Sequence, residues 1–218
     1  MWIFVLIFIL EALENAAEIQ LFKAYVWTKR FLDVVLSVAI LAVGLPIWLL
    51  VAVLVKATSR GPVFFRQRRL GRHGKPFTII KFRTMHPGAE MLNGPQRAMK
   101  KDPRITRLGR FLRRCRMDEV PQFINVLRGE MSVVGPRPER EFFVRQLSPR
   151  IPGYLRRMSV KPGITGWAQV NHKYDENLDD VRCKALYDLY YIEHMSMGMD
   201  LLILVKTIVV ILTGRGAR

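Results

Sequence analysis

Two adjacent acidic residues, Asp118 and Glu119, follow a strongly basic stretch of the chain. The segment from Arg97 to Arg116 holds nine basic residues and one acid, Asp102. Carboxylates in such a field are expected to be ionised, and they could bind a divalent metal or attack a phosphate whose charge the arginines neutralise. A helix predicted from Val120 could add free backbone N–H groups for phosphate oxygens. Local spacing alone favours a simpler interpretation, in which the pair caps that helix.

Arg137 is a candidate phosphate ligand because of its neighbours. It lies between two prolines in the segment 135–138. The prolines restrict the backbone and reduce the entropy lost when the guanidinium binds a phosphate. A rigid surface turn has the same pattern, so both interpretations stay open.

Two other segments could bring polar groups to the same ligand. In residues 81–85 the basic side chains of Lys81 and Arg83 alternate with apolar ones, as on a strand with one face toward an anion. A solvated edge strand fits that pattern equally well. The glycines and the proline of residues 161–170 indicate tight turns, and Gln169 could form a hydrogen bond with a base or a sugar. A purely structural loop is the simpler interpretation of this second segment.

The composition restricts the partners of the chain. It has 35 Lys and Arg against 18 Asp and Glu in 218 residues, a net charge of +17. This excess points to a polyanion: nucleic acid, anionic lipid or a phosphorylated substrate. Cys115 and Cys183 are isolated and lack the spacing of a disulfide framework or a zinc site. The sequence has no GxGxxG, Walker, GxSxG or HExxH motif, so the common nucleotide-binding and hydrolase folds lack support.

The strongest physical signal is an apolar run from Phe31 to Val55, interrupted by Asp33 and Ser37. As a helix it would reach roughly 37 Å, more than the hydrocarbon core of about 30 Å. Basic residues flank both ends, so a straight span would place one basic flank on the wrong side of the membrane. A helix broken at Gly44 and Pro46 would return to the same side, because proline removes a backbone donor and clashes with the preceding turn. A kinked span is the alternative.

Two weaker apolar stretches, residues 1–10 and 201–212, are too short to span a bilayer. Either could form a helix in the membrane interface. The first could instead end a longer membrane region, and the second could be an ordinary docked helix.

The part between them is predicted to be one helix-rich α+β domain. Short strands are expected at residues 61–67, 77–85 and 132–135. A basic amphipathic helix is expected over residues 106–116, a short helix over 120–128, and a helical aromatic segment around 187–192.

Taken together, these motifs resemble one family, the monotopic phosphoglycosyl transferases, also called bacterial sugar transferases. The resemblance runs from about Lys29 to Gly216 and is carried by the run with Pro46 and by residues 61–71, 81–85, 102–114, 118–138 and 161–171. It implies a re-entrant membrane helix (29–58) and a cytoplasmic catalytic domain (59–218) with a C-terminal interfacial helix. Residues 1–28 fall outside the resemblance and are expected to form a separate apolar or amphipathic N-terminal segment.

The resemblance also implies a covalent two-step reaction at the cytoplasmic face of a bacterial inner membrane. Asp118 would attack the β-phosphate of a UDP-sugar and release UMP, and undecaprenyl phosphate would then attack the phosphosugar-aspartate. Mg²⁺ would bridge the pyrophosphate and the two acids, with Glu119 binding metal or helping to activate the acceptor. Arg137 would hold phosphate, with Lys81, Arg83 and Arg114 as weaker candidates. UDP-glucose or UDP-galactose is the expected donor, and the product would initiate exopolysaccharide, capsule or O-antigen synthesis.

Some features leave alternatives open. Leu45 stands where some family members have Ser before the proline, so a serine hydrogen bond at the break is in doubt, although the bend is expected to survive. Larger relatives carry several spanning helices and an extra module, which residues 1–28 cannot hold, so a short form or a catalytic fragment is expected. The bilayer is an expected partner, nucleic acid is not, and a homodimer is left open. A membrane-tethered protein that binds nucleic acid or anionic lipid and a polytopic transferase are the competing functions.

Overall fold

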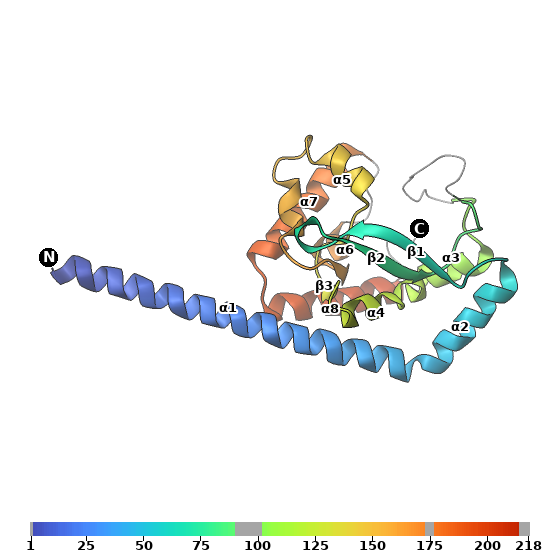
Figure 1. Cartoon of the computed structure of the whole chain (residues 1–218), viewed down its shortest axis with the longest axis horizontal. Helices are drawn as coiled ribbons and strands as arrows, with labels where there is room; N and C mark the ends of the chain where they lie inside the picture. Colours follow the sequence, from blue (N-terminus) through green and yellow to red (C-terminus); the bar gives the residue numbers. More distant parts are fainter. Residues whose placement is uncertain (1, 90–101, 173–176, 214–218) are drawn as a thin grey trace.

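A computed structural model describes residues 2–89, 102–172 and 177–213, with side chains from residue 19 onward. Figure 1 shows one long helix along one side of a small α+β domain, its N-terminal part extending beyond the rest. This helix, α1, spans Trp2–Val43 without interruption, so residues 2–28 continue directly into the apolar run. After Gly44 the chain turns into α2 (Leu45–Thr58), which leads back toward the domain.

The expected break in the apolar run is confirmed at Gly44. No single helix in the described part of the chain is long and apolar enough to cross a bilayer, whereas the pair 19–43 and 45–58, bent by 65°, passes the same criteria together. Pro46 lies in the first turn of α2, where a missing N–H costs little. Leu45 has no hydroxyl group and cannot make the hydrogen bond that a serine could make at the break. A different side chain bridges the bend, because the indole N–H of Trp48 donates to the carbonyl of Ile40 at 3.0 Å.

The predicted strands and helices of the domain are confirmed, with small shifts at their ends. β1 (Phe64–Leu70) and β2 (Pro76–Phe82) form an antiparallel hairpin around the turn η1 (Arg72–Gly74). The following helical elements are α3 (Arg107–Arg114), η2 (Met117–Glu119), α4 (Gln122–Leu127), α5 (Glu141–Leu147), η3 (Tyr154–Met158), α6 (Trp167–Asn171), α7 (Leu178–Glu193) and α8 (Met197–Thr213). The fold class is therefore the predicted helix-rich α+β.

The strand β4 (Gly163–Thr165) was not predicted from the sequence. β3 (Ser132–Val134) pairs in parallel with β4 (Gly163–Thr165), which was predicted to be only turns. A Cβ at position 163 would overlap the backbone of Gly135, so glycine is needed for this close approach. A three-residue strand in a glycine-rich segment has no alternating pattern that could have revealed it.

Polar side chains attach α1 to the domain. Asp33, buried within the apolar run, accepts a hydrogen bond from the backbone N–H of Val133 in β3 at 3.0 Å. Arg30 donates to the carbonyl of Val126 at the end of α4, and Lys29 forms an ion pair of 2.7 Å with Asp200 of α8. The polar interruption at Asp33 therefore marks the side of α1 that contacts the domain.

The opposite sides of α1, α2 and α8 are apolar and exposed. The exposed side chains include Phe31, Val35, Val38, Leu49, Val53, Leu201, Val205, Ile208 and Leu212. The main core lies on the inner side, where Val126, Met131 and Tyr191 pack with Ile203 of α8. The single-sided burial of α8 fits the docked and the interfacial interpretation alike.

The bend depends on the contact between Gly44 and Trp48. A Cβ at position 44 would overlap the indole ring, so we expect Gly44→Ala to destabilise the protein by about 1–3 kcal/mol. With Trp48→Ala already present, the same change should cost much less, because the indole ring that the added Cβ would meet is gone. Unfolding of the four proteins in one detergent measures this coupling. Equal effects of Gly44→Ala in both backgrounds would contradict the packing.

Candidate active site

Asp118 and Glu119 lie in η2, between α3 and α4. The chain enters this turn through Arg116, whose φ of 56° is in the left-handed region and ends the run of α3. Neither η2 nor α4 has a side-chain hydrogen bond at its N-terminus. The helix-cap interpretation is therefore wrong. Both carboxyl groups are nevertheless buried, so contacts other than capping must account for their position.

Glu119 is held by two cations from distant segments. Its Oε1 accepts a hydrogen bond from Lys81 Nζ of β2 at 2.9 Å and one from Arg137 Nη2 at 2.7 Å. Burial by itself would raise the pKa of Glu119, but the charges of Arg137 and Lys81 outweigh burial and hold the pKa well below its usual range. Two of the predicted phosphate ligands thus meet at one carboxylate, which is ionised.

Asp118 has the opposite environment. In the described part of the chain its carboxyl group accepts no hydrogen bond and forms no ion pair. Burial, and then the charge of Glu119, raise its pKa, and the charges of Lys81, Arg113 and Arg116 offset only part of that rise. Asp118 is therefore a buried, unpartnered carboxyl group in a basic setting, as a nucleophile toward a phosphate requires.

Arg113, rather than the predicted Arg114, faces this pair from α3. Its Nε donates to Thr84 Oγ1 at 2.9 Å, and its charge acts on Asp118. Arg114 is exposed, and no described contact joins it to either acid. Gly109 could have indicated Arg113 in the sequence. It is the buried glycine of α3, and Arg113, four positions later, lies on the same face of the helix. The basic residues 97–101 of the predicted field lie outside the described residues.

Arg83 is not gathered with the carboxylates. Its Nη2 donates to the carbonyls of Ser59 at 2.6 Å and Val55 at 3.4 Å, so it binds the C-terminal end of α2. Helix C-termini leave such carbonyls without intrahelical partners, and a cation there is favourable. The alternation that suggested an anion site for both Lys81 and Arg83 brings only Lys81, of β2, to the acids.

Gln169 uses its amide locally. Its Nε2 donates to the carbonyl of Ile164 at 2.8 Å, while its Oε1 is buried without a hydrogen-bond partner. No described contact joins it to Asp118 or Glu119. A role in binding a base or a sugar stays a prediction.

The two carboxylates suit Mg²⁺ chemically. The described residues contain no group of three or more His, Cys, Asp or Glu side chains that could hold a metal. Mg²⁺ in phosphoryl-transfer sites is bound by one or two carboxylates together with substrate phosphates, so a full protein cage is not required. Both oxygens of Asp118 and Oε2 of Glu119 have no described partner and could serve.

The opposed pKa shifts predict opposite effects of two isosteric substitutions on stability. Because the pKa of Asp118 is raised, its favourable contribution exists at low pH and is lost as pH rises through the folded pKa. Asp118→Asn should therefore stabilise the protein at pH 7, and this gain should vanish at pH below about 4. Urea unfolding at both pH values measures it.

Glu119→Gln should behave in the reverse way. The lowered pKa of Glu119 contributes stability above its unfolded pKa, and this is lost as pH falls. Removing the charge should cost roughly 1.5–3 kcal/mol at pH 7, because Lys81 and Arg137 lose a charged acceptor. Two shifts of the same sign at pH 7 would refute the division between the acids.

Comparisons with known proteins place the chain in a family. Residues 24–214 match the family described as bacterial sugar transferase. Over 194 residues the chain is 47% identical to the UDP-N-acetylgalactosamine-undecaprenyl-phosphate N-acetylgalactosaminephosphotransferase of Aeromonas hydrophila, covering 89% of this chain and 46% of the relative. It is 44% identical over 182 residues to the UDP-glucose:undecaprenyl-phosphate glucose-1-phosphate transferase of Escherichia coli K12, covering 83% and 39%.

A relative of similar length also matches. The exopolysaccharide production protein PSS of Rhizobium leguminosarum is 39% identical over 197 residues, covering 86% of this chain and 97% of the relative. The chain thus spans less than half of the first two relatives and most of the third. The family match covers the apolar run, the carboxylate pair and the Arg137 segment, and the chain belongs to the bacterial sugar transferase family.

Proposed function

We propose that the chain transfers hexose-1-phosphate from a UDP-sugar to undecaprenyl phosphate, through a phosphosugar-aspartate on Asp118. The observation that carries this proposal is the unpartnered carboxyl group of Asp118 beside Glu119, whose Oε1 is held by both Lys81 and Arg137. The names of the relatives support the two substrates. Because these names include both a glucose and an N-acetylgalactosamine transferase, the hexose is left open, and initiation of a surface polysaccharide is part of the proposal.

In the first step an oxygen of Asp118 attacks the β-phosphorus of the donor. The bond from that phosphorus to the oxygen bridging the two phosphates breaks, and its electron pair leaves with UMP. In the second step an oxygen of undecaprenyl phosphate attacks the same phosphorus, and the bond to Asp118 breaks. The Asp118 carboxyl group accepts no hydrogen bond in the described part of the chain, so its oxygen has no such contact to break before it attacks.

The basic residues and the second acid have separate tasks in this scheme. Arg113, Arg116 and Lys81 bring positive charge to the phosphoryl oxygens, where charge is carried in the transition state. Glu119 has a pKa far below neutrality, so it is a poor proton acceptor and is better suited to hold a metal. Mg²⁺ held by Asp118 and Glu119 would neutralise the pyrophosphate.

The reaction is tested by UMP release from purified protein with labelled UDP-hexoses and undecaprenyl phosphate. Asp118→Asn should abolish release, because an amide cannot form the intermediate, and EDTA should do the same until Mg²⁺ is restored.

Arg113→Ala should reduce kcat/KM by about 100-fold, whereas Arg114→Ala should change it less than about twofold. Full activity of Asp118→Asn would exclude the nucleophile, and salt-sensitive DNA binding without UMP release would favour the binding protein.

We also propose that α1 and α2 enter the cytoplasmic face of a bacterial inner membrane and return to it. The exposed apolar sides of both helices, the 65° bend and the basic residues at both ends support this arrangement. The bilayer is then a partner of the chain, and α8 would lie in the interface.

Single cysteines at Lys23 and Arg60 test the topology, in a background with Cys115 and Cys183 replaced by serine. Both positions are exposed at opposite ends of the bent pair. An impermeant maleimide should label neither cysteine in intact cells and both after permeabilisation. Labelling of one position alone in intact cells would indicate a straight span.

A further inference from the structure

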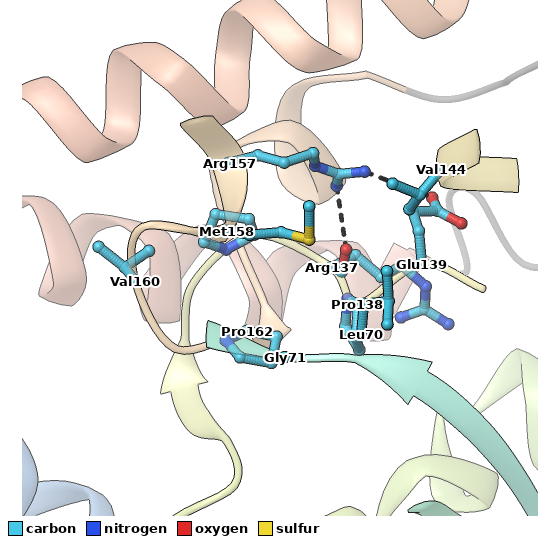
Figure 2. A pocket seen from close by; sticks show the side chains of 11 residues that line it. Leu70, Gly71, Arg137, Pro138, Glu139, Val144, Arg157, Met158, Val160 and Pro162 are labelled. Atoms are coloured by element: carbon cyan, nitrogen blue, oxygen red, sulfur yellow. Dashed lines mark hydrogen bonds and ion pairs between the residues drawn. The ribbon is translucent and has the colours of Figure 1, made fainter. Parts of the chain in front are cut away.

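We infer that Arg157 is a positioning residue, which holds the Arg137 segment so that the Arg137 guanidinium meets Glu119. This inference rests on the proposed function. Arg157 lies in η3, is buried, and belongs to none of the segments that carry the carboxylates or their cations. Figure 2 shows its side chain extending over a pocket toward the backbone carbonyl of Arg137, with Glu139 beside it.

The Arg157 guanidinium is fixed by its own partners. Its Nη2 donates to Asp188 Oδ2 of α7 at 2.7 Å and to the carbonyl of Arg137 at 2.9 Å, and its Nη1 donates to the hydroxyl of Tyr154 at 2.9 Å. The carboxylate of Glu139 lies 3.8 Å from Nη1. Asp188 is almost fully buried, so this ion pair is shielded from solvent. The hydrogen bond to Arg137 is therefore made by a group that cannot swing away freely.

The whole Arg137 segment is held through its carbonyls. The carbonyl of Pro136 accepts from the N–H of Gly163 at 2.9 Å, that of Arg137 from Arg157, and that of Pro138 from Arg69 Nη1 at 3.2 Å. Each donor comes from a different part of the chain. The two prolines restrict their own φ angles, and Pro138 also narrows the backbone angles of Arg137. The hydrogen bond from Arg157 adds a direct constraint on the position of the Arg137 carbonyl.

The consequence reaches the active site through one side chain. The Arg137 guanidinium lies 2.7 Å from Glu119 Oε1, and an ion pair of this kind depends on the placement of the Arg137 backbone. A shift of about 1 Å in a group that orients reactants can cost about 100-fold in rate. Loss of the Arg157 contact should therefore lower turnover, although Arg157 itself touches neither carboxylate.

Arg157→Lys is the informative variant, because lysine can keep the ion pair with Asp188 while losing the fork that also reaches Arg137. We expect kcat to fall about 10- to 100-fold at saturating substrates. The matched control is Arg156→Ala, since Arg156 is exposed and pairs with Glu193 at the surface. That variant should stay within about twofold of the unmodified protein.

A double-mutant cycle separates positioning from general damage. If Arg157 acts through Arg137, then Arg157→Lys should cost less than about twofold when Arg137→Ala is already present. Losses that multiply would assign Arg157 a merely structural role and overturn the inference. Should Arg157→Lys fail to fold, Asp188→Asn, which removes the partner of Arg157, takes its place in the same cycle. No UMP release from the unmodified protein would instead overturn the proposed function and this inference with it.

Discussion

The pairing of Glu119 with Lys81 and Arg137 is the interaction on which the site depends. Two adjacent carboxylates cannot both be buried next to each other without compensation, because each loses hydration and repels the other. The cations from β2 and from the Arg137 segment neutralise Glu119 directly. Asp118 is thereby left buried but unpaired. Glu119, which stays in place, is neutralised by two ion pairs, whereas Asp118 has none and is left reactive.

The same pairing links the site to the apolar helices. Asp33 of α1 holds the N–H of Val133 in β3, and the chain passes from β3 through Gly135 directly into the Arg137 segment. β4 borders that segment, and its Gly163 binds the carbonyl of Pro136. A short path of backbone contacts therefore connects the side of α1 that faces the domain to the cation that holds Glu119. In the proposed membrane arrangement, this path sets the site at a fixed place relative to the bilayer surface.

Features governed by local chemistry could be predicted from the sequence. Gly44 and Pro46 determine the bend, the β-like composition of residues 61–67 and 77–85 indicates two strands, and the spacing of apolar residues in 106–116 indicates α3. Contacts between distant segments could not be predicted in this way. Arg83 and Lys81 share one strand pattern, yet one binds the end of α2 and the other binds Glu119, because the choice depends on where α2 and η2 lie.

The helix-cap interpretation failed for an instructive reason. Spacing describes which backbone N–H groups a carboxylate could reach, but it says nothing of the cations that tertiary structure brings to it. Arg157 shows the same limit, since no motif marks it and its importance lies in its hydrogen bonds to two distant segments, at Arg137 and Asp188.

Burial of an unpaired Asp118 disfavours the folded state, and this cost has a use in the proposed reaction. The raised pKa means that the protein stabilises the ionised carboxylate less well than water does. When the oxygen of Asp118 forms its bond to phosphorus, the localised charge of the carboxylate is lost, and so is much of its repulsion from Glu119. The nearby cations, Arg113, Arg116 and Lys81, can then act on the phosphoryl oxygens. A site that paired Asp118 as firmly as Glu119 would be more stable, but its nucleophile would have to break those contacts before it could react.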